Sequence, residues 1–272
     1  MSNKSLIDIN SLIHSKNKSS KNWINHNFLF KKVSGILLDK LSELGECFEN
    51  ILILSSDAGE CSEKLTQIRS RNLIFYSPFR SLLKINKGQS KKIYKVEGSF
   101  EELPFKSAKF DLVISNLYLH NIINKELHFK KLFELLNKNG LLICNFYGEK
   151  TMYELTNSLF STDEKLYGGA FLRIIPNPTM VNISDQLSLS GFKELVSENI
   201  SFKIYYDNVF EILKDIKGIG ENKILISRKK SLMTKNFLNI LNQEYKKKFS
   251  EKNRLKLTCD IVSISCWKNV SQ

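Results

Sequence analysis

Residues 110–147, FDLVISNLYLHNIINKELHFKKLFELLNKNGLLICNFY, decide the fold of this chain. The apolar run Phe110–Ser115 is typical of a buried strand, and the spacing after it predicts a helix over about Lys125–Leu136. Asn139-Gly140 is expected to end that helix before a second strand at Leu141–Tyr147. A strand, a helix and a strand in this order predict two parallel strands joined by a right-handed crossover.

The same alternation runs back toward the N-terminus. Apolar residues at helical spacing predict a helix over residues 28–44, and three short apolar runs predict strands at Ile51–Leu54, Leu73–Tyr76 and Lys92–Glu97. Five strands that alternate with helices favour an α/β fold with a mostly parallel sheet and helices on both faces. Ligands of such sheets bind beyond the carboxyl ends of the strands.

The pattern changes after Gly148. Helices are expected near Glu149–Phe160, Met180–Ser190, Asn208–Lys217 and Leu232–Lys247, and strands at Lys193–Tyr206 and Leu257–Trp267. We therefore divide the chain into an N-terminal helical segment (1–45), a ligand-binding half (46–150) and a substrate-side half (151–272) that completes the same sheet.

The charge of the chain is concentrated near its ends. Residues 1–40 carry a net +5 and residues 228–256 a net +8, which together account for the whole net charge of +13. A nucleic-acid groove in the central body is therefore not expected. The basic segments suit RNA, an acidic protein or an anionic membrane face, but only 6 of the 41 basic residues are Arg, so solvated lysine-rich helix ends are the simpler interpretation.

Several classes of protein are disfavoured. No apolar run approaches the roughly 18 residues of a membrane span. Asp8 interrupts the N-terminus and no Arg precedes Arg69, so neither a signal peptide nor a convincing transit peptide is predicted, and a cytoplasmic location is expected. The five scattered Cys suit reduced thiols, and the four His stand at no ligand-like spacing, so no metal site is predicted.

Specific motifs resemble a known family. Gly98–Phe105 (GSFEELPF) followed by Phe110–Ser115 resembles the third-to-fourth-strand region of class I S-adenosylmethionine-dependent methyltransferases, and Asn139–Ile143 resembles that family's entry to its fifth strand. Further pieces are similar to one subgroup, the biotin-pathway methyltransferase-like proteins and the mitochondrial complex I assembly factor that hydroxylates arginine. These pieces are His26–Leu29, Leu117–His120, Tyr147–Leu155, Gly168-Gly169 before Pro176, Asp215–Asn222 and Cys266-Trp267.

The resemblance implies a Rossmann-like sheet of seven strands, mostly parallel with an antiparallel last strand, and S-adenosylmethionine as cofactor. Its cofactor motif is degenerate in this chain. The family's hydrophobic-Asp-Leu-Gly-x-Gly-x-Gly corresponds to a stretch in which Ile53 replaces the acid, Ser55 and Asp57 replace two glycines, and only Gly59 is kept. Losing the acids that bind ribose and adenine would cost about 3–6 kcal/mol of binding free energy.

The predicted cofactor residues come from the loops after the first four strands. By resemblance they are Ser55, Asp57, Gly59, Tyr76, Ser99 and Asn116. Tyr76 stands where the family has the ribose-binding acid, and Ser99 where it has the acid that binds the adenine amino group. The alternatives are that Gly59 is an ordinary turn glycine and that Tyr76 and Ser99 lie beside a vacated pocket.

The predicted reacting and substrate-side residues lie nearby. His120 follows the fourth strand and is the candidate general base or substrate hydrogen bonder, with a purely structural role as the alternative. Tyr118 is expected on the substrate side, and Gly168, Gly169 and Arg173 are expected in a lid or, alternatively, in a plain connecting loop. Gly218–Glu221 is either a helix stop or another wall of the cleft.

Three functions remain open on this basis. The first is an S-adenosylmethionine-dependent methyltransferase with weakened cofactor binding, acting on a small acyl or protein substrate. The second is a protein arginine hydroxylase-like modifier of a respiratory complex I subunit. The third is a non-catalytic pseudoenzyme that has lost the cofactor and serves as a binding or assembly factor for complex I.

Overall fold

The computed structural model describes residues 8–45, 47–66, 68, 70–85, 93–221 and 234–269. Its helices are α1 Ile9–Ser19, η1 Ser20–Asn25, α2 Phe28–Leu44, α3 Glu60–Leu65, α4 Arg80–Ile85, η2 Leu119–Asn121, α5 Lys125–Leu135, α6 Tyr153–Tyr167, α7 Met180–Leu189, α8 Val209–Gly218 and α9 Lys235–Phe249. Its strands are β1 Asn50–Ser55, β2 Asn72–Ser77, β3 Ile93–Glu97, β4 Phe110–Asn116, β5 Leu136–Tyr147, β6 Lys193–Tyr206, β7 Ser250–Glu251 and β8 Arg254–Trp267.

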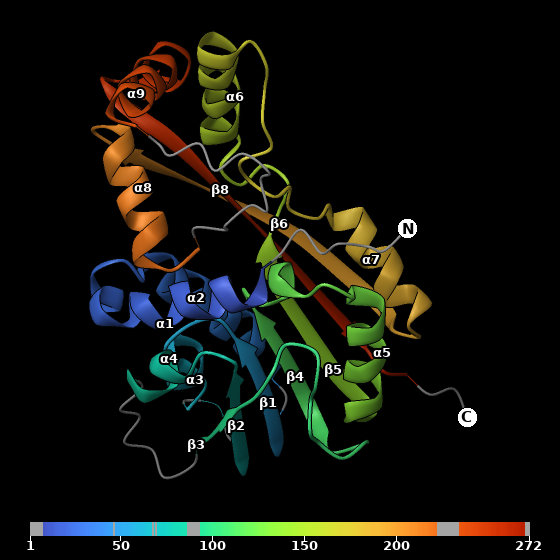
Figure 1. The fold of residues 1–272 in the computed structure, drawn as a ribbon. Coiled ribbons are helices and arrows are strands. Elements are labelled where there is room, and N and C mark those ends of the chain that lie inside the picture. Colours follow the sequence, from blue (N-terminus) through green and yellow to red (C-terminus); the bar gives the residue numbers. More distant parts are fainter. Residues whose placement is uncertain are drawn as a thin grey trace.

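One sheet organises these elements, with the strand order β3-β2-β1-β4-β5-β8-β6 (Figure 1). The first five strands are mutually parallel, and β8 runs antiparallel to both of its neighbours. The two-residue β7 pairs only with β8. The predicted seven-stranded, mostly parallel sheet with a reversed last strand is therefore confirmed, with β7 as a small addition.

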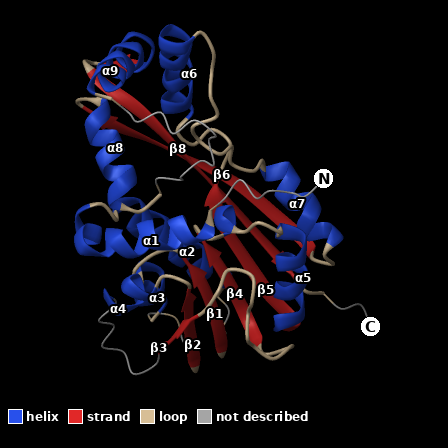
Figure 2. Ribbon diagram, in the orientation of Figure 1, coloured by secondary structure: helices blue, strands red, loops and turns tan. Residues whose placement is uncertain are grey.

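Helices cover both faces of this sheet (Figure 2). Successive side chains of β1 enter different cores, because strand residues alternate between the two faces. Ile51 and Ile53 pack with residues of α2, α3 and α4, whereas Leu52 and Leu54 belong to the larger core that includes α5 and α7. All four residues are completely buried, which explains why β1 is a continuous apolar run.

A third apolar cluster lies where β6 and β8 extend past the rest of the sheet. Helices α6, α8 and α9 surround this end of the two long strands (Figure 1). The cluster joins Leu155 and Leu159 of α6 to Ile212 of α8 and Leu241 of α9. The second half of the chain thus both completes the sheet and builds a helical lobe beside it.

Two predicted boundaries are wrong. Asn139-Gly140 does not separate a helix from a strand, because α5 passes directly into β5 at Leu136 and Asn139 takes its left-handed φ of 61° inside the strand. Helix α6 begins at Tyr153, after Met152 in a left-handed conformation, and continues to Gly168. Lys92 and Leu232, which begin two other predicted elements, lie outside the described residues.

Candidate functional site

Strand order reverses between β1 and β4, so the carboxyl ends of these strands define the expected ligand crevice. Ser55 ends β1 beside Asn116 of β4, and the Ser55 hydroxyl donates to the Asn116 carbonyl oxygen at 3.1 Å. The Asn116 side-chain oxygen accepts from Asn145 at 3.1 Å. The Asn116 amide nitrogen and the Tyr118 hydroxyl are buried with no hydrogen-bond partner among the described residues.

The loop after β1 is fixed by its own acid. One carboxylate oxygen of Asp57 accepts from the Gly59 amide at 2.7 Å, and the other accepts from the Cys61 amide at 3.3 Å. Gly59 has φ 110°, a conformation that suits glycine and opens α3. Asp57 is completely buried, and burial, with a contribution from the Glu60 carboxylate, raises its pKa to about 7.

This shift predicts a pH effect for Asp57→Asn. The folded-state pKa lies above the ordinary value of 3.8, so the contribution of Asp57 to stability is complete below 3.8 and is lost as pH rises through about 7. His128 acts oppositely, because burial lowers its pKa to about 4, but it is present in both proteins. Over this pH range, the free energy of unfolding of the parent should therefore decrease relative to that of Asp57→Asn as pH rises, and denaturant unfolding at several pH values measures the difference. If the difference between the two proteins does not change with pH, the pKa of Asp57 is not raised.

The tips of β2 and β3 are occupied by an aromatic side chain. Tyr76 is completely buried, and its hydroxyl shares its proton between the carbonyl oxygens of Ser99 (2.8 Å) and Glu102 (2.5 Å). Burial raises the pKa of Tyr76, so the phenol remains a neutral donor. The ring lies against Gly98, since a Cβ built there would stand 2.0 Å from the Tyr76 oxygen. The Ser99 side chain is exposed and accepts from the Glu102 amide instead of facing the crevice.

Three more aromatic rings occupy the space between Tyr76 and the end of β4. Phe79 and Phe100 meet edge to face with centroids 5.5 Å apart, and Phe100 packs on Tyr118 at 5.1 Å. All three side chains are buried. The space between the tips of β2, β3 and β4 is therefore packed with the chain's own aromatic groups.

The Lys16 side chain of α1 reaches the crevice beside the β1 loop. Its side chain is completely buried, and its ammonium lies 2.6 Å from Glu221 Oε1 and 3.5 Å from the Ser56 carbonyl oxygen. The ammonium also lies 5.6, 5.1 and 5.8 Å from the ring centroids of Trp23, Phe30 and Phe79. Aromatic faces attract a cation in this way, so the chain holds its own ammonium in an aromatic cage.

A second connection fastens the N-terminal segment over the β1 loop. Glu60 accepts from the Trp23 indole and from the Asn27 amide, both at 2.6 Å, through one carboxylate oxygen. Its other oxygen accepts from the Ala58 backbone amide at 2.9 Å. Hydrogen bonds to a charged acceptor are the stronger kind, so Glu60 ties η1 and the start of α2 to the tip of β1.

His120 contacts the second carboxylate oxygen of Glu221, the residue that pairs with Lys16. Its Nε2 is 3.2 Å from Glu221 Oε2, and a carboxylate only accepts, so Nε2 carries the proton of this bond. The imidazole also stacks on Tyr147 with centroids 4.7 Å apart. Glu221 therefore bridges Lys16 and His120, which supports the interpretation of Gly218–Glu221 as a wall of the cleft.

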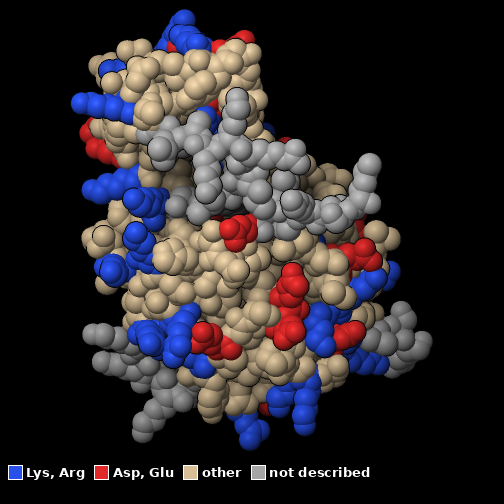
Figure 3. Space-filling model, in the orientation of Figure 1, with Lys and Arg blue, Asp and Glu red and all other residues tan. Residues whose placement is uncertain are grey.

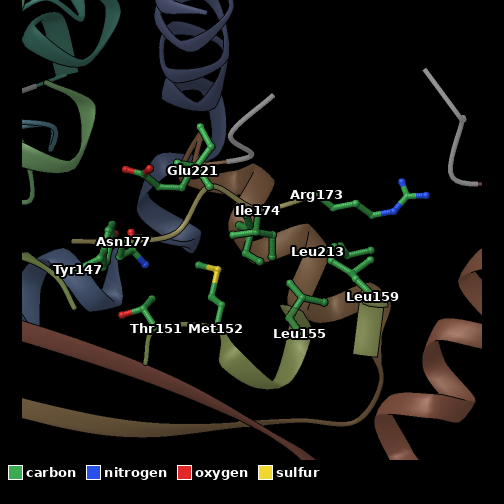
Figure 4. A pocket seen from close by; sticks show the side chains of 12 residues that line it. Tyr147, Thr151, Met152, Leu155, Leu159, Arg173, Ile174, Asn177, Leu213 and Glu221 are labelled. Atoms are coloured by element: carbon green, nitrogen blue, oxygen red, sulfur yellow. The ribbon is translucent and has the colours of Figure 1, made fainter. Parts of the chain in front are cut away.

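A cavity of about 150 Å³ adjoins this bridge (Figure 4). Its lining is mainly apolar and comes from Met152, Leu155, Leu159, Ile174, Leu213 and Ile216, with Tyr147 and Glu221 at its polar side. Arg173 also lines the cavity, but its guanidinium points away from the cluster in Figure 4 and pairs with buried Asp163 at 2.6 and 2.7 Å.

The structure thus brings together only part of the predicted site. Ser55, Asp57, Gly59, Asn116, Tyr118 and His120 lie at the carboxyl edge, and Tyr76 does so as a filling group. Gly168 caps α6 with φ 68°, and neither it nor Gly169 would bring a Cβ within 4 Å of another group. Sequence reasoning missed Lys16, Trp23 and Glu60, because no local pattern around these residues indicates that they meet at this edge.

No helix in the described ranges is long and apolar enough to cross a membrane. Within the same part of the chain, no group of three or more His, Cys, Asp or Glu side chains is placed to hold a metal ion.

The sheet order and the crevice at its reversal point define a methyltransferase-type Rossmann-like fold. Residues 58–144 match the methyltransferase domain family, a finding that supports the class I methyltransferase superfamily. The chain is 25% identical to human arginine-hydroxylase NDUFAF5 over 219 residues, which are 78% of this chain and 64% of that protein. The chain therefore spans less than two thirds of that relative's length.

Two further likenesses agree with this class. The chain is 29% identical to malonyl-[acyl-carrier protein] O-methyltransferase 2 of Ilyobacter polytropus over 231 residues, covering 81% of this chain and 83% of that one. The crystal structure of a putative methyltransferase from Bacillus halodurans superimposes with a TM-score of 0.57 and 15% identity, covering 86% and 99% of the two chains. The latter likeness shows the fold alone.

The side chains at the crevice do not fit S-adenosylmethionine as they stand. This methyl donor carries a sulfonium, an ammonium and a carboxylate, and the region beside the β1 loop already holds the buried Lys16–Glu221 ion pair. The Lys16 side chain therefore fills part of this region, and its ammonium would repel a sulfonium placed beside it. The adenosine would need the space between the tips of β2 and β3, which the Tyr76 ring fills.

Proposed function

We propose that this chain is a non-catalytic member of the superfamily, a binding or assembly factor that keeps the scaffold and closes the donor site with its own side chains. The observation that carries the proposal is the Lys16 ammonium, buried in an aromatic cage and paired with Glu221 at 2.6 Å. Tyr76 over Gly98 supports it from the adenosine side. By the resemblance to the complex I assembly factor, the partner would be a respiratory complex I subunit.

Titration calorimetry and thermal unfolding test the proposal with two ligands. S-adenosylmethionine and S-adenosylhomocysteine share the adenosine, but only the first carries the sulfonium. We expect neither ligand to release heat or raise the melting temperature at millimolar concentration, because both the adenosine and the cation positions are filled. Binding of S-adenosylhomocysteine alone would mean that charge, and not space, excludes the donor. Binding of both ligands would overturn the proposal.

One observation favours a second candidate, a methyltransferase acting on a small acyl or protein substrate. The Asn116 side-chain nitrogen and the Tyr118 hydroxyl are buried at the crevice and have no hydrogen-bond partner in the part of the chain that the structure describes. An unmade hydrogen bond of this kind costs about 1–3 kcal/mol, and a polar ligand would supply the missing partner. This candidate requires Lys16 to leave its cage, and the same titration decides between the two.

The arginine hydroxylase-like activity has its own readout. The relative named arginine-hydroxylase NDUFAF5 suggests it. If the chain had this activity, a complex I subunit isolated from cells that contain the protein would carry one additional oxygen on an arginine, visible by mass spectrometry. The non-catalytic proposal expects an unmodified subunit.

A further inference from the structure

A basic groove lies between the outer face of α1 and helix α8. Its volume is about 620 Å³, and its basic lining comes from Lys18, Lys21, Lys214, Lys217, His14 and His26. Figure 3 shows Lys and Arg side chains gathered along the left edge of the molecule, over α8 and α1. The groove is separate from the crevice, because Lys16 is buried on the inner face of α1 whereas His14 and Lys18 are exposed.

The lysines form two stripes at helical spacing. His14 and Lys18 are four residues apart on α1, and Lys21 follows one turn later in η1. Lys214 and Lys217 are three residues apart on α8. All four lysines are exposed, and none of them forms an ion pair with another described residue.

The two walls are held at a fixed separation. A Cβ on Gly220 would stand 2.8 Å from the Lys16 Cα, and a Cβ on Gly218 would stand 2.3 Å from the His26 ring, so glycines permit the close approach. The acid at the base, Asp215, is already engaged, since it pairs with His26 Nδ1 at 2.6 Å and accepts from the Tyr206 hydroxyl at 2.9 Å. The Asp215 carboxylate is therefore already paired with groups other than these lysines.

We propose that this groove binds an acidic segment of a partner protein. The proposal deepens the proposed function and rests on it, because a binding factor needs a surface for its partner. Lysines present point charges that suit scattered carboxylates, whereas phosphate recognition favours the forked guanidinium of Arg. None of the described residues that line the groove is an Arg. Phe210 is 47% exposed on α8, four residues before Lys214, and offers an apolar contact beside the charges.

The test uses the full chain and a fluorescently labelled oligo-glutamate peptide. Binding should weaken as salt is raised, because exposed charges are screened over about 10 Å at 0.1 M salt. The double variant Lys18→Glu/Lys214→Glu should lower the affinity on the order of tenfold. The matched control is Lys109→Glu/Lys138→Glu, which changes the net charge equally but lies at the amino ends of β4 and β5, and it should bind as the parent does.

Each alternative outcome overturns the proposal. Equal losses in the two double variants would mean that net charge, and not the groove, attracts the peptide. Tighter binding of single-stranded RNA with the same loss in Lys18→Glu/Lys214→Glu would make the groove a nucleic-acid surface. Thermal unfolding of both variants verifies that they are folded. If the peptide does not bind, the result of the titration with S-adenosylmethionine is not affected. The two experiments therefore test the groove and the closed donor site separately.

Discussion

Replacing Glu221 by Gln should lower the free energy of unfolding by about 3–5 kcal/mol, the usual cost of leaving one member of a buried ion pair without its partner. Gln keeps the shape of Glu but removes the charge that stands 2.6 Å from the Lys16 ammonium. Both side chains are almost completely buried, so solvent cannot replace the lost carboxylate. Urea unfolding followed by circular dichroism measures the change.

A double-mutant cycle identifies the cause of this loss. Lys16→Met should cost less than Glu221→Gln, because Glu221 keeps His120 at 3.2 Å while Met retains the packing of the lysine stem. The double variant Lys16→Met/Glu221→Gln should be close to the parent, since replacing a whole buried pair by neutral groups is often neutral or stabilising. If the two single effects simply add, the two groups do not form the buried pair, and the main support for a closed donor site is gone.

The fold was predictable because its signals are local. Ile51–Leu54 is a continuous apolar run and Leu112–Ile114 is another, and completely buried parallel strands require that pattern. The spacing over residues 28–44 likewise gave the helix with the bounds that α2 has. Strand order and the reversed last strand came from the family resemblance, which local patterns could not supply.

The site was less predictable because its contacts are distant in sequence. A lysine in a helix near the N-terminus normally indicates a solvated surface, and nothing local shows that Lys16 turns inward to meet Glu221. The side-chain direction of Tyr76 was equally hidden, since the sequence left it as either a cofactor-binding residue or a residue beside a vacated pocket. In the structure, the Tyr76 side chain points from β2 into the protein. The carbonyl oxygens of Ser99 and Glu102 hold its hydroxyl there.

Gly98→Ala is the second variant with a large expected effect, because its methyl group would enter the Tyr76 ring. The new Cβ would stand 2.0 Å from the Tyr76 oxygen and 2.4 Å from Cζ, both far inside van der Waals contact. The ring cannot move aside cheaply, since its hydroxyl bonds two carbonyl oxygens and its edge packs on Phe105 at 5.7 Å. Overpacking of this kind costs about 1–3 kcal/mol of stability.

The matched control for this variant is Gly169→Ala, where the added methyl meets nothing within 4 Å and the change should stay within about 0.5 kcal/mol. Gly98→Ala should cost less stability in a Tyr76→Ala background than in the parent, because the ring that the methyl group would meet is absent. A Gly98→Ala protein as stable as the parent would mean that Tyr76 swings out of the β2–β3 space without penalty. That space would then be available to an adenosine, and the argument for a filled donor site would rest on Lys16 alone.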